Sequence, residues 1–150
     1  MKVSLRSLVL TAATAGTLLA STGLVLAADP ITERMHGFKG SKHAMAAIRD
    51  AMASGHQAAI TAPAKEIAAF AARIPSLFPA GSTNDQSKAR DAIWDNFPDF
   101  TAKAKTMQTS AQALADLSAS GKATPAQIKS AFVKVTESCK ACHQHYKEKE

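Results

Sequence analysis

Apolar residues recur at separations of three, four and seven along four segments of this chain, and this spacing constrains the fold more than any other feature of the sequence. It places the apolar side chains of each segment on one face of an α-helix. The segments cover about residues 30–55, 57–74, 93–120 and 125–146. Glycine is scarce, with 7 in 150 residues, and alanine supplies many of the apolar positions. We therefore predict an all-α protein that forms an antiparallel four-helix bundle.

Signals for the helix ends support these segments. Asp29 precedes a proline at the first helical position, and Thr124 is followed by a proline and then by a glutamine at the third position, which matches a capping box. Pro75 is expected to end the second helix. Residues 75–85 contain two prolines, a glycine and polar turn formers, so they predict a crossover loop. The third helix is expected to include Trp94.

Two glycines, Gly37 and Gly40, interrupt the first helix. Each weakens a helix interior by about 1 kcal/mol relative to alanine. Their presence predicts that something comes close to this backbone, either a partner helix or a flat ligand.

The N-terminal residues 1–27 have the three parts of a secretory signal peptide. Lys2 and Arg6 precede a long apolar stretch, and small residues follow it up to Ala27. An apolar stretch of about 20 residues is also long enough to span a bilayer, so an uncleaved anchor is the alternative. Threonine, serine and glycine within the stretch disfavour the anchor. We expect cleavage after Ala27 and export of residues 28–150 to the bacterial periplasm as one domain.

The charge of the exported part is mildly basic. Residues 28–150 contain 16 Lys and Arg against 12 Asp and Glu, a net charge of +4. The lysines are spread singly along the chain, and no basic run is interleaved with aromatic residues. This distribution argues against a nucleic-acid partner.

The two cysteines of the chain occur within residues 139–143, Cys-Lys-Ala-Cys-His. This is the C-x-x-C-H pattern that attaches a c-type haem. Because positions three and four apart are neighbours on a helix, Cys139 and Cys142 can form thioether bonds to one haem while His143 turns its imidazole to the iron. The sequence predicts one covalent haem c per chain, near the C-terminal end of the fourth helix. Export agrees, since bacteria complete this attachment beyond the inner membrane.

Three other interpretations of the motif are open at this point. A redox C-x-x-C pair usually lies where a strand feeds the start of a helix, whereas this motif ends one. A zinc site could nominally use both cysteines, His143 and His145, but four ligands within seven residues of one helix cannot surround a metal tetrahedrally. A disulfide between the cysteines is disfavoured by helical geometry. We favour haem attachment.

An exported four-helix domain with C-x-x-C-H near its C-terminus resembles the cytochrome c′ family. Family members begin their first helix with an arginine, followed four positions later by a residue that faces the iron and then by a lysine; Arg34, Phe38 and Lys39 match this pattern. The resemblance covers nearly all of residues 28–150. Further matching positions are Met45, Ile48, Ile93, Trp94, Phe100, Tyr146 and Lys147.

The resemblance implies a role for each matched site residue. Cys139 and Cys142 would hold the haem, and His143 would be the axial ligand of the iron. Arg34 would bond a haem propionate, and Lys147 would lie beside the proximal histidine.

The residue that the resemblance places opposite the iron is Phe38. In relatives of the cytochrome c-556 type a methionine occupies this place and ligates the iron, whereas members with an apolar residue leave the sixth position empty. Since phenylalanine has no donor atom, we expect five-coordinate, high-spin iron that binds small diatomics such as NO and CO and also transfers single electrons. Phe38 offers no polar group for catalysis, so we do not expect an enzyme, and NO scavenging is the one activity that stays open.

The alternative is a six-coordinate, low-spin electron-transfer cytochrome of the c-556 type. Met35 and Met45 lie on the same helix face as Phe38, and either could supply the sulfur ligand. Homodimers through the first two helices are usual in the family, so we also expect a homodimer.

Overall fold

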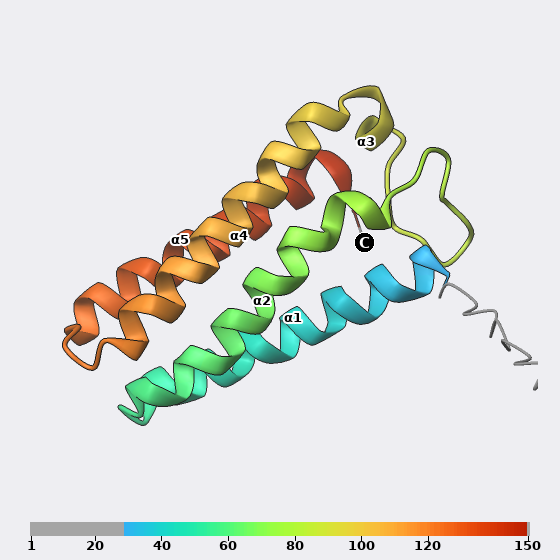
Figure 1. The fold of residues 1–150 in the computed structure, drawn as a ribbon. Coiled ribbons are helices and arrows are strands. Elements are labelled where there is room, and N and C mark those ends of the chain that lie inside the picture. The colour runs from blue at the N-terminus through green and yellow to red at the C-terminus, as the bar shows by residue number, and fades with distance from the viewer. Residues whose placement is uncertain (1–28, 150) are drawn as a thin grey trace, which may run out of the picture.

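The computed structural model describes residues 29–149, which fold into four long helices joined by two short connections and one longer crossover loop (Figure 1). Consecutive long helices run in opposite directions, with α1 and α2 on one side of the bundle and α4 and α5 on the other. The predicted all-α four-helix bundle is confirmed. The α-helices are α1 (Pro30–Ala53), α2 (Thr61–Arg73), α3 (Ala92–Asp95), α4 (Phe97–Ala119) and α5 (Pro125–Tyr146), and the 3-10 turns are η1 (Gln57–Ile60) and η2 (Ile74–Leu77).

The helix starts follow the predicted capping chemistry. At the start of α1, Thr32 N donates to the Asp29 carboxylate at 2.9 Å. At the start of α5, Gln127 N donates to Thr124 Oγ1 at 3.3 Å, and Thr124 N donates to Gln127 Oε1 at 2.8 Å. The capping box is therefore complete, and it satisfies two backbone N–H groups that a helix start leaves without partners.

The third predicted helix is divided in the structure. Trp94 lies on the short helix α3, which ends at Asp95, and α4 begins at Phe97, so Asn96 alone separates the two helices. Asn96 adopts φ −138° and ψ 58°, and its side chain accepts a hydrogen bond from Asp99 N. Pro98 explains the break, because it has no N–H to donate to the carbonyl of Trp94 and is tolerated only in the first turn of a helix.

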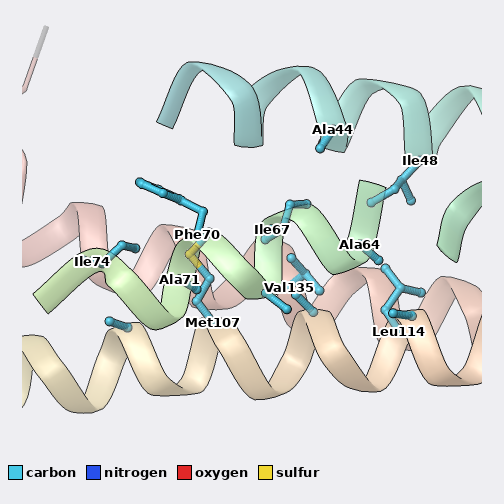
Figure 2. Packing of buried hydrophobic residues seen from close by; sticks show 14 of the residues in the cluster. Ala44, Ile48, Ala64, Ile67, Phe70, Ala71, Ile74, Met107, Leu114 and Val135 are labelled. Atoms are coloured by element: carbon cyan, nitrogen blue, oxygen red, sulfur yellow. The ribbon is translucent and has the colours of Figure 1, made fainter. Parts of the chain in front are cut away.

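The core forms around α2, which lies between α1 and α4 (Figure 2). Small side chains on α2 let the neighbouring helices approach closely, and larger apolar residues from all four helices fill the remaining space. The labelled core residues in Figure 2 include Ala44, Ile48, Ala64, Ile67, Ala71, Met107, Leu114 and Val135.

The crossover loop between α2 and α4 is confirmed, and it is anchored rather than loose. The indole Nε1 of Trp94 lies 3.2 Å from the carbonyl oxygen of Phe78 and 3.1 Å from that of Pro79. Phe78 itself is buried. These contacts hold the loop over the end of the bundle where α1 begins (Figure 1).

The predicted signal peptide and its cleavage site after Ala27 lie outside the described residues. Within residues 29–149, no helix combines the length and the apolar character that crossing a bilayer would require.

One of the two glycines in α1 meets a close neighbour, as predicted. A Cβ atom added at Gly37 would overlap the ring of Phe70 on α2, whereas a Cβ at Gly40 would have nothing within 4 Å. The close approach therefore explains Gly37, and it does not explain Gly40.

These two glycines give a matched test of the contact between α1 and α2. Gly37→Ala is expected to destabilise the protein by about 1–3 kcal/mol, because the methyl group must displace a buried aromatic ring. Gly40→Ala is expected to stabilise it by up to about 1 kcal/mol, the difference in helix propensity. Urea unfolding measures both changes. Equal stabilities for the two variants would contradict the close packing of Phe70 on Gly37.

Candidate functional site

A cavity of about 560 Å³ lies inside the bundle, and both cysteines and His143 line it from α5. This volume falls within the range of about 300–1,000 Å³ that is usual for cofactor and ligand sites. The other helices supply a mainly apolar wall. Its apolar members include Phe38, Met45, Ile67, Ile74, Phe78, Ile93, Phe100 and Met107.

The two thiols are half-buried at the end of α5 and unpaired. Burial raises the pKa of both, and the negative charge that Cys139 carries as a thiolate adds to the effect of burial on Cys142, whose pKa rises to about 11. A redox or nucleophilic cysteine needs a lowered pKa. The environment therefore disfavours the redox-pair interpretation and keeps both side chains as thiols facing the cavity.

The two remaining alternatives also find no support in the described part of the chain. Neither cysteine forms a disulfide. Within residues 29–149, no group of three or more His, Cys, Asp and Glu side chains is arranged to hold a metal ion. The arrangement thus lacks the ligand set of a zinc site.

Across the cavity, the ring of Phe38 faces the imidazole of His143. The two ring centroids are 6.5 Å apart, and the ring planes are inclined by 67°. This is the edge-to-face geometry of two rings that are direct neighbours. A flat conjugated group bound to the imidazole nitrogen would therefore displace the ring of Phe38.

The imidazole is suited to bind a metal through a free nitrogen. Partial burial lowers the pKa of His143, and the positive charge of Lys147 lowers it further. Since a ligating histidine must be deprotonated at the binding nitrogen, both effects favour the form that binds a metal.

The ring of Phe38 is held by other aromatic side chains. Its centroid lies 5.0 Å from that of Phe70 and 6.4 Å from that of Phe78, both in edge-to-face geometry. Such pairs are worth about 0.5–1.5 kcal/mol beyond the area that they bury. The packing keeps a side chain without any donor atom opposite His143.

Two methionines of α1 line the same cavity as Phe38. Met35 is 41% exposed, and Met45 is half-buried against the core. Both residues therefore belong to the wall of the candidate site, on the face of α1 that the helical spacing predicted.

Arg34 is a buried cation, with only 2% of its surface exposed. Its terminal nitrogens donate to the crossover loop, at 3.1 Å to Leu77 O, 2.8 Å to Ser82 Oγ, 2.5 Å to Ser82 O and 2.8 Å to Ser87 Oγ. The guanidinium carbon also lies 4.2 Å from the centroid of the Phe78 ring. The sequence indicated the inner position of Arg34, but these loop partners, more than 40 residues away, carried no sequence signal.

No described carboxylate lies within ion-pair distance of this guanidinium. Burial lowers the pKa of Arg34, an effect that the charge of Asp29 opposes. A buried cation is stable only when hydrogen bonds or an opposite charge compensate it. Arg34 also lines the cavity, so a carboxylate bound there would supply the missing charge.

The end of α5 is clamped against the crossover loop just beyond His143. Arg90 N donates to Tyr146 O at 3.0 Å, and Glu148 N donates to Lys88 O at 2.9 Å. Lys147 leaves the helix in an extended conformation and lines the cavity. The predicted position of Lys147 beside His143 agrees with the effect of its charge on the pKa of that imidazole.

A second clamp joins the end of α5 to the start of α4. The hydroxyl of Tyr146 donates to Asp99 Oδ2 at 2.5 Å, and Lys103 Nζ donates to Asp99 Oδ1 at 2.9 Å. These bonds lower the pKa of Asp99, with the bond from Tyr146 as the largest cause. Sequence reasoning did not identify Asp99, since only the packing of α4 against α5 brings it to Tyr146.

The family model described as cytochrome C′ matches residues 29–147 of this chain. The chain belongs to the cytochrome c′ family. It is accordingly a c-type haem protein, of a family that transfers electrons and binds ligands.

Relatives in sequence and structure agree with this assignment. A cytochrome c-556 from Agrobacterium fabrum is 36% identical over 129 residues, which cover 83% of this chain and 85% of the relative. The structure of cytochrome c′ from Thermochromatium tepidum superposes with a TM-score of 0.72 at 28% identity, over 80% of this chain and 95% of that one. A cytochrome c′ described as having an unusual ligand-controlled dimer dissociation gives the same TM-score and coverage at 26% identity.

The clamp at Tyr146 predicts an unusual titration. Burial, followed by the hydrogen bond to Asp99, raises the pKa of Tyr146 to about 12. The ordinary value is about 10, so the bond stabilises the fold below pH 10 and the contribution is lost as the pH rises to 12. The chain has a single tyrosine, and carbon-13 labelling of its ring gives one NMR signal to follow.

In this titration the wild-type ring is expected to remain protonated at pH 11. Asp99→Asn should lower the midpoint but keep it above 10, because burial remains after the carboxylate is removed. An identical midpoint in the variant would contradict the role of Asp99.

Proposed function

We propose that this protein carries one haem c, bound covalently through Cys139 and Cys142, with His143 as the axial ligand of the iron. When bound, the haem supplies an iron centre that accepts a ligand and changes charge by one electron. The half-buried thiols and the lowered pKa of the imidazole, all facing one cavity, support this assignment.

We further propose that the iron is five-coordinate and high-spin and binds NO and CO. The observation that carries this proposal is Phe38, whose ring lies 6.5 Å from that of His143 and has no donor atom. The aromatic packing of Phe38 against Phe70 makes the distal side a hydrophobic plug that a small uncharged molecule must displace. No catalytic turnover is part of the proposal.

Arg34 and Lys147 would hold the haem carboxylates and the proximal side in this arrangement. Four N–H groups of Arg34 already bind the loop, which leaves the Nε–H group and the positive charge for a propionate. Lys147 lines the cavity next to His143 and would keep positive charge near the axial ligand.

A second candidate is a six-coordinate, low-spin electron carrier with a methionine ligand. The 36% identical cytochrome c-556 favours it, as do Met35 and Met45 in the cavity wall. Such a protein would exchange electrons and would not take up diatomic gases.

Position 38 provides the test between these candidates. The purified wild type is expected to show high-spin ferric bands and to bind CO when reduced. Phe38→Met should give low-spin iron and lower CO affinity by at least about tenfold, because a sulfur ligand worth about 1.4 kcal/mol or more must be displaced. Ultraviolet-visible spectra of both oxidation states, with and without CO, measure the change.

The matched controls are Met35→Leu and Met45→Leu, which should retain the wild-type spectrum. A low-spin wild type that either leucine variant converts to high-spin iron would overturn the five-coordinate proposal and establish the second candidate.

We also propose export to the periplasm through cleavage after Ala27, on the three-part pattern of residues 1–27. The protein isolated from a periplasmic fraction is expected to begin at Ala28, which mass spectrometry of the intact chain and N-terminal sequencing would show. A chain that retains residues 1–27 and stays with the membrane fraction would favour the anchor instead.

A homodimer through α1 and α2 is the proposed assembly. The expectation comes from the family, and the relative with ligand-controlled dimer dissociation supports it.

A further inference from the structure

Every charged side chain that lines the cavity is a cation. None of the described acidic residues lines it. Residues 29–149 contain 16 Lys and Arg and 11 Asp and Glu. Ten of the cations do not line the cavity, and ten carboxylates balance them once Asp99 is counted with the cavity residue Lys103. The positive charge of the domain is therefore concentrated at the cavity. The six cations are Arg34, Lys42, Arg49, Lys88, Lys103 and Lys147.

Negative charges at the site would neutralise only three of these six cations. Asp99 pairs with Lys103 at 2.9 Å. A haem carries two propionate carboxylates, which two further cations neutralise, and Arg34 and Lys147 are placed for this. Three positive charges then remain in excess.

The remaining cations are all exposed at the edge of the cavity. Lys42 and Arg49 lie seven residues apart on α1, on the same face as Phe38, and Lys88 lies on the crossover loop. We call these three residues the basic rim. Two of them follow α1, and the third comes from a separate part of the chain that lines the same cavity.

We propose that the basic rim docks an acidic protein surface beside the haem. This inference rests on the proposed haem site, and it adds a partner to it. Clustered charge of one sign steers an oppositely charged partner and raises the association rate by about 10- to 1,000-fold at low salt. A haem at the cavity would then lie next to the contact, as one-electron exchange between proteins requires.

A protein partner fits the rim better than an anionic membrane does. Stable recognition of anionic lipids generally uses clusters of about 4–8 Lys and Arg, and the rim has three. The described residues that do not line the cavity have nearly balanced charge, which an anionic membrane would not attract.

The first test measures the charge at the electron-transfer face of the holoprotein. Reduced protein gives one electron to hexacyanoferrate(III), and stopped-flow rates are recorded at several ionic strengths. The wild-type rate is expected to fall as salt increases. The triple variant Lys42→Gln, Arg49→Gln, Lys88→Gln should react about tenfold more slowly at low salt and lose most of the salt dependence.

The matched control is the triple variant Lys65→Gln, Lys122→Gln, Lys129→Gln. These lysines are exposed and do not line the cavity, so the control changes the net charge equally at other places. Its rate is expected to stay close to wild type. Equal slowing in both triple variants would overturn the rim, because net charge alone would then explain the effect.

The second test uses an acidic flavodoxin as the protein probe and follows nitrogen-15 NMR shifts of this chain. Shifts centred on Lys42, Arg49 and Lys88, absent in the rim variant, are the expected result. Shifts elsewhere would overturn the proposal, as would rim-dependent binding of phosphatidylglycerol vesicles without flavodoxin binding.

Spectra and CO uptake of the same samples keep this test separate from the proposed function. Normal CO uptake together with no rim effect overturns the docking surface alone. A wild type without the high-spin spectrum would instead contradict the five-coordinate iron. The rate comparison between the two triple variants would still test whether the basic rim is a docking surface.

Discussion

The position of the last turn of α5 is the constraint on which the site depends. Cys139, Cys142 and His143 lie within five residues, so a small rotation of this helix would move all three away from the cavity together. Helix ends fray unless other contacts hold them. Here the backbone pairs with the crossover loop, and Tyr146 bonds to Asp99 at the start of α4. The same loop is held on its other side by Arg34 of α1. Three separate parts of the chain therefore fix the end of one helix.

The cavity exists because some pairs of helices pack closely while others do not. Alanines on α2 allow close contact with α1 and α4, as Figure 2 shows, while α1 and α5 touch sparsely. Aromatic residues line the space between them, and Phe38 packs edge-to-face against Phe70 and Phe78 at its wall. An apolar cavity is costly because the atoms that line it lack van der Waals partners on one side. A bound haem would remove that cost, so the folded bundle and its cofactor would stabilise each other.

The positive charges of the site form two groups, one buried and one exposed. Arg34 is buried with four hydrogen bonds and no carboxylate partner, while Lys42, Arg49 and Lys88 remain exposed at the opening. Cations inside the cavity suit the carboxylates of a haem, and cations at its edge suit an acidic partner. A nearly neutral surface elsewhere would let the rim dominate the field that an approaching molecule meets.

The sequence by itself determined what depends on neighbours along the chain. Helical spacing, the cap at Asp29, the capping box at Thr124 and the C-x-x-C-H motif all act within a few residues, and each appears in the structure where the pattern places it. The break at Asn96 was missed although Pro98 marks it locally. Only the tertiary structure decided which distant side chains meet. The pairing of Arg34 with Ser82 and Ser87, of Asp99 with Tyr146, and of Phe38 with His143 joins residues about 50 to 100 positions apart. The three cations of the basic rim are likewise far apart in the sequence, and they form one group only because α1 and the crossover loop pack together. Packing sets which residues are close in space, and it leaves no periodic pattern in the sequence.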